Sequence, residues 1–407
     1  MKAAGTDTMK NEIKYEKSEL ELMTTYQLRE ICRREKIMNG VIHPLDKEEL
    51  IQSIMRYMGK RQDFFICDKK KEGEERVEEF LKKTRIVIKP CKELYCQSQI
   101  LAYEGLSIEY YDGYTIPYKK ELSGTNAFLM GSDMTLCAIL NLKEHGGRQE
   151  KLYLTKAAEL ETRETQRKDY RIFCMGRQTS ESLYHLYYGE HTILPEHIEV
   201  YSIPLIDFVV RKPVTLMLPM AIDFGSVNTT AGVYLDSAYF ENVGEQAAVK
   251  NCRENEINYT AFEDGNGESM LLPSVIGVLA VEEEDYKLLF GYDAIRLANA
   301  SYVDEGFCVF YDVKRWIGEY EKEEEIVDRQ GRRRLVKRAE ILRRFFLYII
   351  RKTENRFKCR ISQVHISSPV KQKHYFRRMF REILPEYMTD QETMLDEGMA
   401  VLYNTIS

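Results

Sequence analysis

One stretch of the chain combines the residue types that hold a phosphate group and a divalent cation. Residues 221–234 read AIDFGSVNTTAGVY. An Asp ends an apolar run, a Gly permits a sharp turn, and hydroxyl and amide side chains follow. Backbone N–H groups in such a turn can form a concave anion site, and the carboxylate suits hydrated Mg²⁺. The pattern predicts a β-hairpin that presents these groups to one point. The alternative is an ordinary glycine turn with polar caps.

The elements that follow this hairpin alternate between strands and helices. We expect strands at 272–278 and 364–369, a turn at 290–294 that leads into a short helix, and helices at 335–357 and 371–384, with a further helix opening at 395. The longer helix has an amphipathic pattern. The residues expected on its buried stripe are Leu335, Ala339, Leu342, Phe346 and Ile349. This alternation predicts an α/β fold for the second half of the chain.

Five short segments, in this order and spacing, resemble the first half of the actin-like ATPase superfamily, closest to the nucleotide-binding domain of DnaK-type chaperones. They are the hairpin at 223–229, Pro273-Ser274-Val275, and the segments 310–318, 368–370 and 396–403. The chain departs from the family pattern in having one extra residue between Phe310 and Asp312 and Gly398 in place of a proline. The resemblance implies a ribonuclease H-like lobe over residues 216–407.

The same resemblance implies ATP and Mg²⁺ as cofactors and gives the hairpin residues their roles. Asp223 would hold Mg²⁺ through water. The backbone N–H groups of Gly225, Ser226 and Val227 would bind the phosphates, with the Ser226 hydroxyl as a further donor. The remaining residues of the implied phosphate motif are Asn228 and Thr229.

Two residues outside the hairpin are implied as catalytic. Lys314 would neutralise charge that develops on the transferred phosphoryl group. Glu397 would orient the waters of Mg²⁺ or link two lobes. The plain alternatives are a surface lysine at 314 and, at 397, a helix N-terminal glutamate that complements the helix dipole.

The family closes its nucleotide between two lobes, and the second glycine-rich phosphate turn does not occur after Glu397. We therefore expect this chain to be a fragment or truncated product that lacks the second lobe. The complete protein would be an ATP hydrolase whose nucleotide state controls a protein partner or an assembly, and this chain alone would be inactive. A filament-forming ATPase is a further alternative, in which the charged insert 321–338 pairs between subunits; a solvated loop or hairpin is its plainer interpretation.

Residues 22–61 predict a small helical module. Thr24 or Thr25 can cap one helix, Asn39-Gly40 ends it, and Leu45-Asp46 opens a second. The pattern at 23–59 resembles the SAP and Rho-N-terminal helix-extended-helix modules, whose members often bind DNA or RNA. The matching residues are Leu28, Arg29, Ile37, Lys47, Glu48, Leu50 and Ile54.

Eight Lys and Arg against five Asp and Glu give residues 22–61 a surplus of three positive charges. Phosphate binding needs several cations on one face. The candidate nucleic-acid contacts are Arg29, Arg33, Arg34, Lys36, Lys60 and Arg61. The alternative to the ATPase is thus a non-enzymatic scaffold that binds nucleic acid or a protein through this module.

The remaining boundaries come from changes in composition. We expect a disordered tail at 1–21, a charged helical linker at 62–83, and a mainly β domain at 84–215 with a helix near 155–167. Many tyrosines in this domain either form a recognition surface or pack their rings along strands. Its histidines have no metal-ligand spacing.

Composition limits the class of protein and its compartment. The 407 residues carry a net charge of −6, 44% hydrophobic and 30% charged residues, which is typical of a globular protein of two or three domains. Nine scattered cysteines without a CxxC pair favour a reducing cytoplasm over a disulfide framework. No uncharged run approaches membrane-spanning length, so we expect no membrane association.

Overall fold

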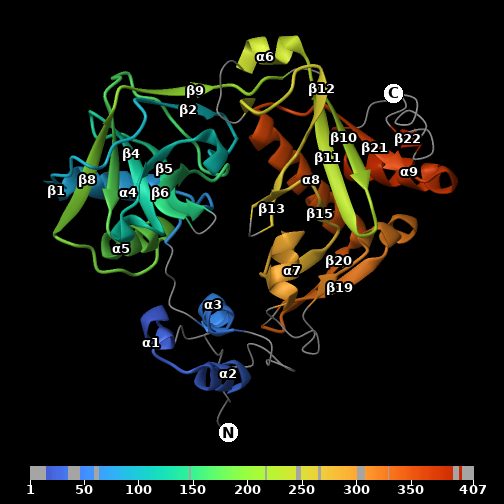
Figure 1. Cartoon of the computed structure of the whole chain (residues 1–407), viewed down its shortest axis with the longest axis horizontal. Helices are drawn as coiled ribbons and strands as arrows, with labels where there is room; N and C mark the ends of the chain where they lie inside the picture. Colours follow the sequence, from blue (N-terminus) through green and yellow to red (C-terminus); the bar gives the residue numbers. More distant parts are fainter. Residues whose placement is uncertain are drawn as a thin grey trace, which may run out of the picture.

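The computed structural model describes a mixed α/β protein in three parts (Figure 1). The described residues are 15–34, 46–58, 64–145, 148–215, 218–243, 249–264, 267–299, 308–328, 330–387 and 394–396. We call the three parts the helical module (15–58), the β domain (64–215) and the C-terminal lobe (218–396). In the described part of the chain, no helix is both long and apolar enough to cross a membrane.

Three helices make the helical module: α1 (Lys17–Glu21), α2 (Thr25–Arg34) and α3 (Lys47–Met58). Two helices were expected, and the residues predicted to begin them are confirmed. Thr24 and Gln27 form a reciprocal capping pair at α2, and Asp46 and Glu49 form one at α3. The helix α1 lies within residues 1–21, which we expected to be a disordered tail. This part of the tail is ordered because Leu20 is fully buried in the small core of the module.

The β domain is built on a large curled sheet of seven strands. In spatial order these are β1 (Arg85–Lys89), β8 (His197–Leu205), β7 (Tyr170–Met175), β4 (Thr125–Gly131), β5 (Leu136–His145), β6 (Arg148–Thr155) and β3 (Thr115–Pro117). Neighbouring strands are antiparallel, apart from the parallel pair β1–β8. This sheet agrees with the mainly β character predicted for residues 84–215.

Two helices, α4 (Gly73–Lys83) and α5 (Arg177–Tyr188), share a core with one face of this sheet. The expected linker at 62–83 is therefore partly wrong, since Val77 and Leu81 of α4 are buried in that core. A second core includes the short parallel sheet of β2 (Gln99–Tyr103) and β9 (Asp207–Arg211). The helix expected near 155–167 is absent from this described stretch, where turns follow β6.

The C-terminal lobe contains a sheet whose strands come from distant parts of the chain. In spatial order they are β12 (Glu256–Tyr259), β11 (Asn228–Leu235), β10 (Pro219–Phe224), β21 (Gln363–Ser368) and β22 (Met394–Asp396). The strand β11 is antiparallel to both β12 and β10, and β21 and β22 run parallel to β10. The carboxyl ends of β10, β21 and β22 therefore lie at one edge of the sheet.

Two helices cover one face of this sheet: α8 (Arg338–Phe357) and α9 (Lys373–Ile383) (Figure 1). The Phe346 ring packs edge to face on Phe224 at 5.0 Å and on Phe380 at 4.7 Å between centroids. Residues of β10 alternate between buried and exposed. Because Phe224 is buried, its neighbour Asp223 lies on the exposed face.

Smaller elements lie between β11 and α8. They are α6 (Ser237–Val243), β13 (Phe262–Glu263), β14 (Glu268–Ser269), β15 (Leu272–Pro273), β16 (Ile276–Val281), β17 (Tyr286–Phe290), α7 (Tyr292–Asn299), β18 (Val309–Phe310), the 3₁₀ helix η5 (Val313–Glu319), β19 (Glu323–Val327) and β20 (Arg333–Lys337). The charged insert forms the hairpin β19–β20. Leu335 lies on this hairpin and is 63% exposed, so its expected place on the buried stripe of α8 is wrong.

Candidate functional site

The hairpin between β10 and β11 closes through a four-residue turn. The Gly225 N–H donates to the Asn228 carbonyl oxygen at 3.1 Å. A Cβ atom at position 225 would lie 2.3 Å from the same oxygen, which is far inside van der Waals contact. Glycine is therefore required by this close approach of two backbone segments. The sequence prediction of a glycine-dependent hairpin at this position is confirmed.

The tip of the turn carries two open donors. Ser226 and Val227 are exposed, and their backbone N–H groups donate no hydrogen bond within the described part of the chain. Val227 exposes 75% of its surface. The Gly225 N–H, expected as a third phosphate donor, already has its partner in Asn228. The anion-binding capacity of the turn is thus two backbone donors, with the Ser226 hydroxyl beside them.

A buried pair of hydroxyl groups supports the turn from beneath. The Ser274 Oγ donates to the Gly225 carbonyl oxygen at 2.8 Å, and its backbone N–H donates to the Val227 carbonyl oxygen at 2.8 Å. Since the single Ser274 hydroxyl proton is used, the Thr229 hydroxyl must donate to Ser274 Oγ, at 2.9 Å. Thr229 and Ser274 are both fully buried. Thr229 was predicted to contact the cofactor, and in this structure it supports the turn.

Asp223 stands beside the turn on the exposed face. It pairs with Thr230 across the β10–β11 ladder. The Ser367 Oγ, at the carboxyl end of the parallel strand β21, donates to Asp223 Oδ1 at 2.5 Å. One bond leaves most of the acceptor capacity of this carboxylate open to a further ligand. Ser367 is not among the predicted site residues, although the predicted strand at 364–369 and the edge rule for parallel strands could have indicated it.

Lys314 lies on η5, which packs against α9. Its side chain is half-buried, and its ammonium group is 5.8 Å from the centroid of the Phe376 ring. Phe376 is in the first turn of α9, and α9 begins five residues after β21 ends. The structure therefore places Lys314 against the first turn of α9, the helix that follows β21 in the chain.

The backbone just before Lys314 is unusual. Asp312 adopts a left-handed conformation with φ 50° and ψ 46°, which few residues other than glycine and asparagine tolerate. Its carboxylate receives the Arg315 Nε at 2.8 Å, and its carbonyl oxygen receives the Arg315 N–H at 3.1 Å. These two bonds fix the turn that sets the direction of η5.

Of the other predicted site residues, those that the structure describes do not join this group. Glu397 lies outside the described residues, as do Lys36, Lys60 and Arg61. In the helical module, Arg33 pairs with Glu30 at 2.9 Å and Arg34 donates to the Tyr15 hydroxyl. Arg29 is half-buried on α2. The structure thus describes three of the six candidate nucleic-acid contacts.

The chemistry of the hairpin region fits an anion and, through one carboxylate, a hydrated cation. Within the described ranges, no three His, Cys, Asp or Glu side chains gather as direct metal ligands. A single carboxylate that acts through water does not need such a cluster. No protein-family model and no curated protein matches this sequence.

Proposed function

We propose that the C-terminal lobe is the first lobe of an actin/DnaK-like ATPase and binds Mg-ATP at the 223–229 hairpin. The observation that carries the proposal is a glycine-locked turn with two exposed N–H donors beside an exposed carboxylate. In open α/β sheets ligands bind outside the carboxyl ends of the strands, which is the edge that holds Asp223 and Ser367. The strand order of the lobe also supports a ribonuclease H-like sheet.

Each residue has a distinct part in this proposal. The N–H groups of Ser226 and Val227 bind phosphate oxygens, as backbone donors in a turn do for anions. Asp223, oriented by Ser367, accepts hydrogen bonds from water bound to Mg²⁺. The ion, when present, neutralises phosphate charge. Lys314 adds a positive charge to the site. The nucleotide state of the complete two-lobed protein would then control a partner or an assembly.

Isothermal titration of the full chain with Mg-ATP tests the proposal. We expect one site, weakened at least about tenfold by Asp223→Asn, because the variant loses the charge that holds the hydrated ion. Asp293→Asn is the matched control, since Asp293 is another exposed carboxylate, paired with Arg296 on α7. Equal affinities for the wild type and Asp223→Asn would contradict the assignment of Asp223. Absence of any binding would contradict the function.

A further inference from the structure

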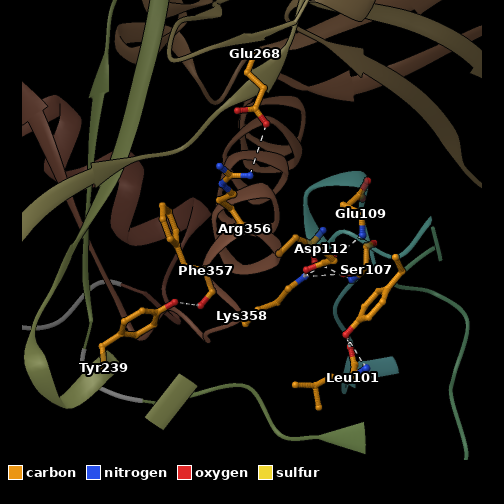
Figure 2. Close-up of polar contacts among 11 residues, drawn as sticks. Leu101, Ser107, Glu109, Asp112, Tyr239, Glu268, Arg356, Phe357 and Lys358 are labelled. Atoms are coloured by element: carbon orange, nitrogen blue, oxygen red, sulfur yellow. Dashed lines mark hydrogen bonds and ion pairs between the residues drawn. The ribbon is translucent and has the colours of Figure 1, made fainter. Parts of the chain in front are cut away.

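The β domain and the C-terminal lobe meet through a buried ion pair at the end of α8 (Figure 2). Lys358 Nζ lies 2.9 Å from both carboxylate oxygens of Asp112, which ends the 3₁₀ helix η1 (Tyr110–Asp112) of the β domain. It also donates to the Ser107 carbonyl oxygen at 3.2 Å. The two charged side chains expose only 4% and 8% of their surface. A pair this deeply buried costs desolvation and persists only with good geometry.

The backbone at Lys358 indicates that the lysine side chain matters at this position. Lys358 follows the last residue of α8 and has φ 52° and ψ 37°, the left-handed conformation that glycine usually provides at helix ends. Glycine would fit this backbone better than lysine does. The lysine is therefore not explained by the helix ending. Its contacts with Asp112 and Ser107 explain it.

Three further polar contacts surround the ion pair. The Ser107 N–H donates to Asn355 Oδ1 at 3.0 Å, and the Arg360 Nη2 donates to the Glu104 carbonyl oxygen at 3.0 Å. The Arg356 guanidinium lies 4.6 Å from the centroid of the Tyr111 ring. All three join the 104–112 segment of the β domain to the 355–360 segment of the lobe. We call these two segments together the latch.

The chain that connects the two parts passes along the same segment. The Val214 N–H donates to the Lys358 carbonyl oxygen at 3.1 Å, and the Arg360 N–H donates to the Val214 carbonyl oxygen at 2.9 Å. Val214 also forms a parallel bridge with Cys359. The backbone of 358–360 therefore holds the connection between the two parts, while the Lys358 side chain holds the face of the β domain.

We propose that the latch is a reversible docking contact, in which Lys358 determines whether the β domain stays fixed against the C-terminal lobe. The contacts named here are polar or ionic, and polar contacts between domains permit relative motion, whereas large apolar contacts do not. Release at Lys358 would free the β domain to move about the connection near Val214. The inference does not depend on nucleotide binding by the lobe.

Amide hydrogen exchange of the full chain tests the proposal. In Lys358→Gly the backbone keeps its preferred conformation and the cation is lost. We expect exchange at the Ser107 N–H group to become at least about tenfold faster, with a larger radius of gyration in X-ray scattering. Phe128 in the β domain and Val233 in the lobe lie inside strands and should keep their exchange rates.

Two further variants make the test specific. Asp112→Asn weakens the same contact from the β-domain side and should give the same pattern. Asn255→Gly relieves a left-handed backbone of φ 58° away from the latch and should change nothing. Unchanged exchange at Ser107 in Lys358→Gly would overturn the proposal. So would faster exchange at Phe128 or Val233 in both latch variants, because the pair would then serve the folding of one domain.

Discussion

The hairpin tip at 225–227 and the latch are both polar regions that hydrogen bonds hold in place. They differ in whether their hydrogen-bond donors already have partners within the protein. At the hairpin, the bonds of Ser274 and Thr229 are satisfied beneath the turn, and the N–H groups of Ser226 and Val227 have no partner in the described part of the chain. At the latch, the Lys358 ammonium group has acceptors in both Asp112 and Ser107.

This difference separates a region suited to a ligand from a region suited to an internal contact. Donors that the chain leaves open at an exposed turn can bind an anion without breaking any existing bond. Donors that are buried and paired cannot be used without the cost of an unpaired charge. Replacing one residue of a bonded pair in each region tests this difference.

The largest effect is expected at the latch. Asp112→Leu leaves the Lys358 ammonium group without its counter-ion, which should weaken the docking of the β domain on the lobe by about 3–5 kcal/mol. The double variant Asp112→Leu with Lys358→Met removes both charges and should be closer to the wild type than the single variant. Amide exchange at Ser107 in the three proteins measures this. Faster exchange at Ser107 in the double variant than in Asp112→Leu would contradict the importance of the ion pair.

A second buried lysine can be compared with Lys358. Lys156 is 5% exposed and donates to the Ala157 carbonyl oxygen at 3.2 Å, and no described carboxylate lies within ion-pair distance of it. Burial lowers the pKa of its ammonium group to about 8. Because the unfolded chain keeps its usual value of 10.5, the unfolded state binds more protons between these pH values. Stability should therefore rise as the pH increases from about 8 to about 10.5.

Lys156→Met isolates this effect from other titrating groups. At pH 7 the variant should be more stable than the wild type by as much as about 3 kcal/mol, and the difference should shrink as the pH increases through the same window. Thermal unfolding at several pH values measures it. A constant difference across that window would show that burial of this charge is not the cause.

The smallest effect on stability is expected beneath the hairpin. Ser274→Ala leaves the Gly225 carbonyl oxygen and the Thr229 hydroxyl group without their shared partner and should lower the free energy of unfolding by about 1–2 kcal/mol. Ser132→Ala, at an exposed serine in the turn after β4, serves as the control. Denaturation curves that coincide for Ser274→Ala and the wild type would remove the support assigned to Ser274.

Much of the local structure could be predicted because it depends on neighbouring residues. The helix expected at 371–384 is α9 (Lys373–Ile383), since its apolar spacing and its preceding Pro369 are both local signals. The helix expected at 335–357 begins at Arg338 instead. Leu335 fits the helical pattern, and pairing with Glu325 in the β19–β20 hairpin overrides it.

Contacts between distant segments had no such signal. Asp112 and Lys358 are 246 residues apart, and neither belongs to a periodic pattern that indicates a partner. The helix α5 had no sequence signal either, because its Tyr184, Tyr187 and Tyr188 are typical of strands. Burial of Tyr187 beside α4 stabilises a helix there. At the candidate site, the sequence predicted the glycine turn, but the bond from Gly225 to Asn228 and the support from Ser274 depend on folding.

The most direct test of the hairpin is the response of its own amides to nucleotide. In a chain labelled with ¹⁵N-serine and ¹⁵N-valine, we expect saturable chemical-shift changes at the Ser226 and Val227 N–H groups on titration with Mg-ATP. These changes should disappear in Gly225→Val, whose side chain cannot fit against the Asn228 carbonyl oxygen, and persist in Gly318→Ala, where a Cβ meets nothing within 4 Å. Shifts that leave Ser226 and Val227 unchanged at saturating Mg-ATP would contradict the proposed phosphate site.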